Sequence, residues 1–93
     1  MLPKPRRVED EGYLEYLRQL PCTACQKTPA EPHHLESRGS GGSDYTCLPL
    51  CREHHAEFHS RGNRTASATH GLDAWREAHR LSTTWLLSRL EQQ

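Results

Sequence analysis

Two pairs of potential metal ligands, each with two residues between its members, constrain the fold of this chain more than any other feature. Cys22 and Cys25 form the first pair, and Cys51 and His54 form the second. A two-residue gap lets one tight turn present both donor atoms to the same ion, and tetrahedral zinc takes four nitrogen or sulfur ligands. The sequence therefore predicts a structural zinc held by these four side chains.

The remaining cysteine leaves an alternative open. Cys47 could replace Cys51 or His54 as a zinc ligand, but it lies in the apolar stretch 45–50, where a thiol acts as a small hydrophobic side chain. We favour the ligand set without Cys47. A redox role for the first cysteine pair would be expected beside a βαβ pattern, which the sequence lacks.

The composition explains why such a chain needs a metal. Its 93 residues amount to one small domain, and only 33% of them are hydrophobic. A core of this size stabilises a fold weakly unless a metal or disulfides reinforce it.

Residues 1–7 are basic and proline-rich without a following apolar segment, and no apolar run approaches the roughly 18 residues that span a bilayer. We therefore expect a cytoplasmic protein whose reduced thiols bind metal.

Apolar spacing and turn residues predict a single small α+β domain, residues 1–93, in which residues 1–7 are disordered. The predicted order is a helix over 8–20, a cysteine-bearing turn over 21–32, strands over 33–35 and 45–50 around a Gly/Ser loop at 37–43, a helix over 51–60, a polar linker over 61–71 and a helix over 72–91. Apolar residues recur at helical spacing in the last helix: Leu72, Trp75, Ala78, Leu81, Trp85, Leu86 and Leu90. We expect Trp75, Trp85 and Leu90 to pack over the core.

Four histidines indicate a second metal site. His55 and His59 are one helical turn apart, so both imidazoles leave the same helix face and can hold a catalytic divalent ion with positions open for water and substrate. One member of the doublet His33–His34 would complete the ligand set, whereas its neighbour points to the opposite face of an extended strand. That neighbour is a candidate general base, since an imidazole pKa of about 6.5 suits proton abstraction near neutral pH.

These residues also match the motif of a known family: His33–His34, Pro49–Leu50–Cys51, His54–His55 and His59. Together they resemble the HNH endonucleases, nucleases of the ββα-metal (His-Me finger) fold, and most closely the small phage and prophage members with a zinc knuckle. The resemblance covers residues 21–60. It implies a ββα core stapled by a structural zinc, flanked by the N-terminal and C-terminal helices, and it implies a bacterial or phage-infected cell.

The histidine spacing is similar, in addition, to that of the colicin-type nuclease domains. Carried over residue by residue, this resemblance makes His33, His55 and His59 the ligands of one divalent ion and His34 the general base. The ion it implies is Mg²⁺ or Mn²⁺, with Ni²⁺ or Zn²⁺ as alternatives. The zinc-bearing members imply the same structural roles for Cys51 and His54 that the spacing predicts.

One position departs from the family pattern. Thr46 stands where the family usually has an asparagine that orients the catalytic histidine. The only asparagine, Asn63, lies after the motif, so we do not expect it to fill that place. Thr46 or Asp44 is therefore expected to orient His34.

The implied reaction is hydrolysis of a phosphodiester bond in double-stranded DNA, by nicking or by double-strand cleavage. The chain has 12 basic and 12 acidic residues, which argues against a binder of polyanions held by net charge alone. Arg38, Arg61 and Arg64 are candidate phosphate contacts.

The alternative function is a zinc-ribbon module that binds DNA or protein without catalysis, in which every cysteine and histidine serves structure.

Overall fold

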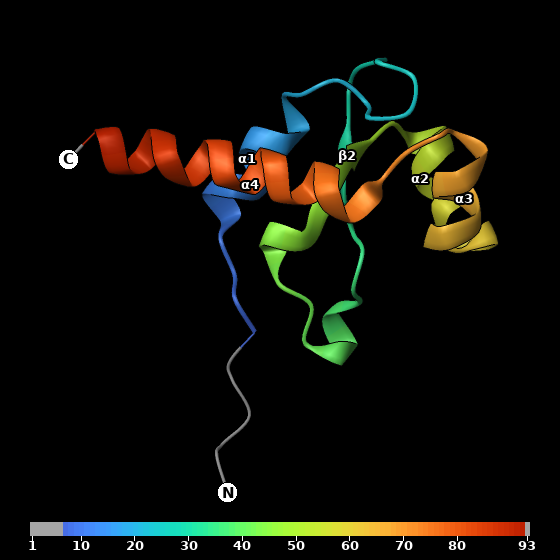
Figure 1. The fold of residues 1–93 in the computed structure, drawn as a ribbon, viewed down its shortest axis with the longest axis horizontal. Coiled ribbons are helices and arrows are strands. Elements are labelled where there is room, and N and C mark those ends of the chain that lie inside the picture. Colours follow the sequence, from blue (N-terminus) through green and yellow to red (C-terminus); the bar gives the residue numbers. More distant parts are fainter. Residues whose placement is uncertain (1–6, 93) are drawn as a thin grey trace, which may run out of the picture.

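A two-stranded antiparallel sheet organises the chain, which the computed structural model describes over residues 7–92. β1 (Glu31–His34) pairs with β2 (Cys47–Leu50), so that His33 lies opposite Leu48 and His34 opposite Cys47. The described residues also form four α-helices and two short 3₁₀ helices: α1 (Glu11–Arg18), η1 (Arg38–Ser40), η2 (Asp44–Thr46), α2 (Arg52–Arg61), α3 (Asn63–Thr69) and α4 (Ala74–Glu91). In Figure 1, α2 and α3 pack together at one end of the molecule, and α4 runs to the other end.

Local signals fix the ends of the helices. The Asp10 side chain accepts a hydrogen bond from the Tyr13 backbone N–H and caps α1, and Asp73 caps α4 in the same way. Gly62 has φ of 88°, a backbone conformation that suits glycine, and this residue ends α2 and starts α3. Helix α3 therefore folds back beside α2 instead of extending it.

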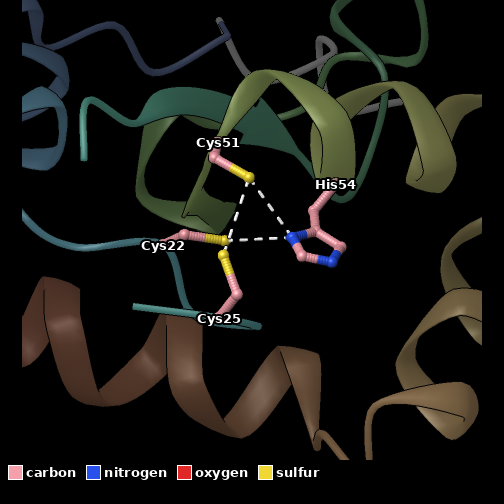
Figure 2. A group of neighbouring side chains, drawn as sticks. All are labelled: Cys22, Cys25, Cys51 and His54. Atoms are coloured by element: carbon pink, nitrogen blue, oxygen red, sulfur yellow. Dashed lines mark hydrogen bonds between the residues drawn. The ribbon is translucent and has the colours of Figure 1, made fainter. Parts of the chain in front are cut away.

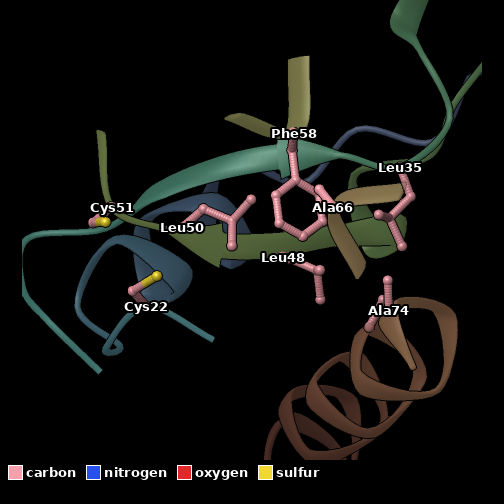
Figure 3. Packing of buried hydrophobic residues seen from close by; sticks show 9 residues of the cluster. Cys22, Leu35, Leu48, Leu50, Cys51, Phe58, Ala66 and Ala74 are labelled. Carbon is pink, nitrogen blue, oxygen red and sulfur yellow. The ribbon is translucent and has the colours of Figure 1, made fainter. Parts of the chain in front are cut away.

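The core occupies both faces of the sheet because strand residues alternate between them. Leu48 and Leu50 lie on one face, where Phe58 of α2 and Ala66 of α3 pack against them (Figure 3). Cys47 lies on the other face. Its buried neighbours belong to α1 and α4: Tyr13, Leu14, Leu17 and Leu81. The hairpin thus fixes the positions of all the helices that carry site residues.

The predicted small α+β architecture is confirmed, although several of its bounds were wrong. The helix expected over 8–20 is shorter, and the strands expected over 33–35 and 45–50 begin or end up to two residues away. The polar linker expected over 61–71 is wrong, since most of it forms α3. Its sequence has no apolar periodicity, and the helix is held by the turn at Gly62 and by the burial of Ala66.

The packing expected along the last helix is also wrong in part. Ala78 and Leu81 are buried, but Trp75, Leu86 and Leu90 are 54%, 41% and 63% exposed. The body of the molecule covers only one side of α4 and leaves its C-terminal turns open (Figure 1).

No helix within residues 7–92 is long and apolar enough to cross a membrane. Of the segment expected to be disordered, residues 1–6 lie outside the described residues, and Arg7 pairs with Asp44.

Candidate metal centre and histidine cavity

The first cluster brings together the four predicted zinc ligands. The Nδ1 atom of His54 lies 3.2 Å from Cys51 Sγ and 3.6 Å from Cys22 Sγ, and Cys25 Sγ lies 3.8 Å from Cys51 Sγ (Figure 2). Zinc bonds of about 2.3 Å to sulfur and 2.0–2.1 Å to nitrogen place tetrahedral ligands roughly 3.3–3.8 Å apart. The four side chains therefore could bind a metal such as zinc.

Two local structures present these ligands. Cys22 and Cys25 lie on a turn after α1, where the Gln26 N–H donates to the Cys22 carbonyl, and the Thr23 N–H donates to Pro49 of β2. Cys51 is the N-cap of α2, which has no side-chain cap of its own. The ligands from the turn thus meet the ligands from α2 at the end of the hairpin.

The electrostatics of the cluster favour a thiolate at Cys22. Burial by itself raises the pKa of Cys22, but hydrogen bonds from backbone N–H groups, including those of Cys51 and Cys25, lower it to about 6. The thiolate is the form of cysteine that binds metal. The Cys22 turn is therefore organised to stabilise a ligand in its charged state.

Cys47 is absent from this cluster. It is fully buried between α1 and α4, and burial raises the pKa of its thiol to about 12. A thiol held in its neutral form among apolar side chains acts as a core residue. The ligand set without Cys47 is the one that the structure brings together.

A second cluster lies in a cavity of about 600 Å³ between β1, α2 and the start of α3. The imidazole nitrogens of His33, His55 and His59 can all approach within 4.8 Å of one another, and the rings lie 4.8–5.2 Å apart between centroids. His34 also lines this cavity. The four histidines singled out from the sequence therefore share one site.

The His55 ring has a carboxylate beside one nitrogen and His59 beside the other. His55 Nδ1 lies 2.8 Å from Glu31 Oε1, and its Nε2 lies 3.2 Å from His59 Nε2. A metal-binding histidine commonly donates its other N–H to a carboxylate. Two nitrogens on one tetrahedral ion lie roughly 3.3 Å apart, given bonds of 2.0–2.1 Å. The spacing of the α2 pair fits a shared ion.

Asn63 orients the third ring. Its side-chain N–H donates to the Leu35 carbonyl at 2.7 Å, so its oxygen faces His33 Nε2, also at 2.7 Å, and accepts from it. His33 Nδ1 is consequently the acceptor nitrogen, and it is buried without a hydrogen-bond partner among the described residues. Burial, partly offset by Asn63, lowers the pKa of His33 and so favours the neutral ring, the form that binds metal.

Asp44, rather than Thr46, contacts His34. The Oδ1 atom of Asp44 accepts from His34 Nε2 at 2.8 Å and from Arg7 at 3.0 Å, and Oδ2 accepts from the Asp10 backbone N–H at 2.8 Å. Burial tends to raise the pKa of Asp44, but these hydrogen bonds lower it overall. The Thr46 hydroxyl instead donates to the Ser43 carbonyl. An ionised Asp44 holds the proton of His34 on Nε2 and leaves Nδ1 as the acceptor.

The three candidate arginines lie in different places. Arg38 lines the histidine cavity, whereas Arg61 pairs with Glu57 on the surface of α2. Arg64 lines a separate groove between α3 and α4. Only Arg38 is positioned beside the four histidines.

Sequence reasoning missed two residues of the site. Glu31 lies two positions before His33, on the same face of β1, and this spacing could have revealed it. Asn63 was set aside because it follows the motif, and no local signal shows that Gly62 turns it back toward His33. It contacts His33 and not His34.

The fold and these two clusters define a small α+β protein with a Cys₃His cluster able to bind a metal and a three-histidine cavity beside it. The chain belongs to the family described as "Protein of unknown function (DUF968)", which it matches over residues 1–83. It is similar to "Uncharacterized protein YdfU" of Escherichia coli (strain K12), with 42% identity over 64 residues. That match covers 63% of this chain and 18% of the relative, so the chain spans less than a fifth of that protein. No solved structure matches the chain.

Proposed function

We propose that this chain is a metal-dependent DNA endonuclease of the HNH type. The observation that carries the proposal is the meeting of four histidines in one cavity, where His33, His55 and His59 each have a ligand atom within 4.8 Å of the others and His34 lines the same wall. The order β1, β2, α2 agrees with a ββα core. The substrate in this proposal is DNA in the cytoplasm of a bacterial or phage-infected cell.

In this proposal, a divalent ion on the three histidines, Mg²⁺ or Mn²⁺, would stabilise the charge on the phosphorane and on the departing 3′ oxygen. His34 takes a proton from the attacking water through Nδ1, because Asp44 holds the proton on Nε2. Arg38 lies at the cavity wall, where its guanidinium can contact the phosphate. Glu31 and Asn63 orient the ligand rings.

The Cys₃His cluster serves structure in the same proposal, with zinc as its metal. Structural zinc contributes on the order of 10 kcal/mol to folding in small domains. We expect Cys22→Ala and Cys25→Ala to lose zinc and to unfold, which circular dichroism and metal analysis measure. A variant that kept its structure without bound zinc would refute this role.

Cleavage of supercoiled plasmid tests the enzyme directly. We expect nicking by the zinc-loaded protein with Mg²⁺ or Mn²⁺, and a fall of about 10²–10⁴-fold in rate for His34→Ala with divalent-ion affinity retained. His55→Ala should lose both cleavage and affinity, as Mn²⁺ titration calorimetry measures. His79→Ala is the matched control, because His79 is exposed on α4 and lies outside the cavity.

Two outcomes would contradict the proposal. If the protein failed to cleave under every divalent ion tested while it still bound one zinc, the non-catalytic zinc-ribbon module would become the better function. If His34→Ala lost the ion and His33→Ala retained it, the roles of ligand and base would be reversed.

A further inference from the structure

A groove between α3 and α4 lies next to the histidine cavity but takes no part in the chemistry above. It has a volume of about 520 Å³, in the range of about 300–1,000 Å³ that holds small organic ligands. Asn63 lines both the groove and the histidine cavity. The groove therefore adjoins the histidine cavity at the residue that holds His33.

The groove has an aromatic wall. Trp75 lies in the first turn of α4, lines the groove and is 54% exposed. Unpaired bases stack on exposed aromatic rings, and every base has a face for this contact. Trp85, by comparison, packs against Tyr13 and Tyr16 and serves the core. Trp75 is thus the tryptophan of this chain that can stack on a ligand.

Polar groups around the ring suit a nucleotide. Arg64 lines the groove, is exposed and forms no ion pair within the described part of the chain, so it can pair with a phosphate. Asp73 uses Oδ1 to cap α4, which leaves its other oxygen to accept from an exocyclic amino group of a base. Ser67 also lines the groove, and its buried hydroxyl has no partner among residues 7–92.

We infer that this groove binds an unpaired nucleotide of the DNA substrate, stacked on Trp75 and held by Arg64 through its phosphate. The inference rests on the proposed nuclease function and narrows its substrate to DNA with a single-stranded segment beside the cleaved bond. A base within an intact duplex is stacked on its neighbours and cannot enter the groove. The carboxylate of Asp73 favours cytosine over thymine, because thymine has no exocyclic amino group.

Binding of short fluorescent oligonucleotides tests the inference without cleavage, since the zinc-loaded protein is used with no other divalent ion. We expect Trp75→Ala to weaken binding of oligodeoxycytidine by roughly 5- to 150-fold. Trp75→Phe should restore most of that affinity because it keeps a ring, and Arg64→Gln should weaken binding and reduce its salt dependence. Binding of a duplex of the same length should change little in Trp75→Ala.

Leu87→Ala is the matched control, because Leu87 is 52% exposed on the same helix and lies outside the groove. Circular dichroism shows whether each variant is folded. If Trp75→Ala and Leu87→Ala bound oligodeoxycytidine equally, or if Trp75→Ala lost duplex and single-strand binding to the same extent, the inference would be wrong. Equal affinity for oligodeoxycytidine and oligothymidine would overturn the role of Asp73.

The two proposals fail separately. Plasmid cleavage with unchanged oligonucleotide binding in Trp75→Ala would overturn the groove and leave the nuclease standing. Selective loss of single-strand binding in a protein that never cleaves DNA would leave the groove as a binding site and overturn the nuclease.

Discussion

Replacing Asp44 by asparagine tests the buried network that joins the N-terminal segment to His34. The Asp44 side chain is 3% exposed and accepts hydrogen bonds from three donors, of which Arg7 and His34 share Oδ1 and the Asp10 N–H uses Oδ2. The asparagine amide keeps one acceptor oxygen and replaces the other by an NH₂ group. At least one of the three donors then faces another donor in a buried place.

The expected cost follows from that lost partner. Breaking one hydrogen bond to a charged group costs about 1.5–3 kcal/mol of unfolding free energy. For a chain of this size, that loss lowers the urea midpoint by roughly 1–2 M. Asp44→Asn and the wild type are compared at one protein and zinc concentration, because bound metal shifts the apparent stability. Glu36→Gln is the control, since it removes the same charge from an exposed side chain.

The same variant also bears on the reaction. If Asp44 sets the tautomer of His34, Asp44→Asn should nick plasmid more slowly than the wild type. The loss in rate should not exceed the fall of about 10²–10⁴-fold expected for His34→Ala. Divalent-ion affinity should be retained, because Asp44 contacts none of the three candidate ligands. An unfolding free energy within about 0.5 kcal/mol of that of Glu36→Gln would refute the buried network.

Three further predictions concern packing and ligand assignment. Gly42→Ala should destabilise the protein by about 1–3 kcal/mol in urea unfolding, because its Cβ would lie 1.9 Å from the Glu36 carbonyl oxygen, whereas Gly39→Ala meets no atom within 4 Å and should be neutral. Phe58→Ala should cost about 3–5 kcal/mol in the same assay, since this ring fills the core beside the sheet. Cys47→Ala should still bind one zinc by metal analysis, and a loss of zinc would place Cys47 among the ligands.

The sequence predicts the parts of the site whose ligands are close along the chain. The Cys22–Cys25 and Cys51–His54 pairs each lie on one turn, and the His55–His59 pair lies on one helix face, so residue spacing alone indicates their geometry. The hydrogen-bond partner of His34 could not be predicted from residue spacing. Asp44 and Thr46 are both candidates from the sequence, and only the fold of the hairpin loop decides between them.

Elements held by tertiary contacts were harder to predict. Helix α3 has no apolar stripe and depends on Gly62 and Ala66, so its sequence resembles a linker. Trp75 and Leu90 do lie at helical spacing, yet spacing does not say how far the body of the protein extends along α4. Periodicity therefore predicted the helix correctly and the burial of its ends wrongly.

Helix α2 connects the two clusters physically. Cys51 occupies its N-cap position and His54 lies in its first turn, whereas His55 and His59 lie on the helix face that lines the cavity. Successive residues are about 100° apart around a helix, so His54 and His55 can serve different sites. A helix of 10 residues is marginal alone, and this one has no side-chain cap. A metal at the Cys₃His cluster would therefore fix the start of α2, and with it the spacing of the two histidine ligands, without entering the cavity.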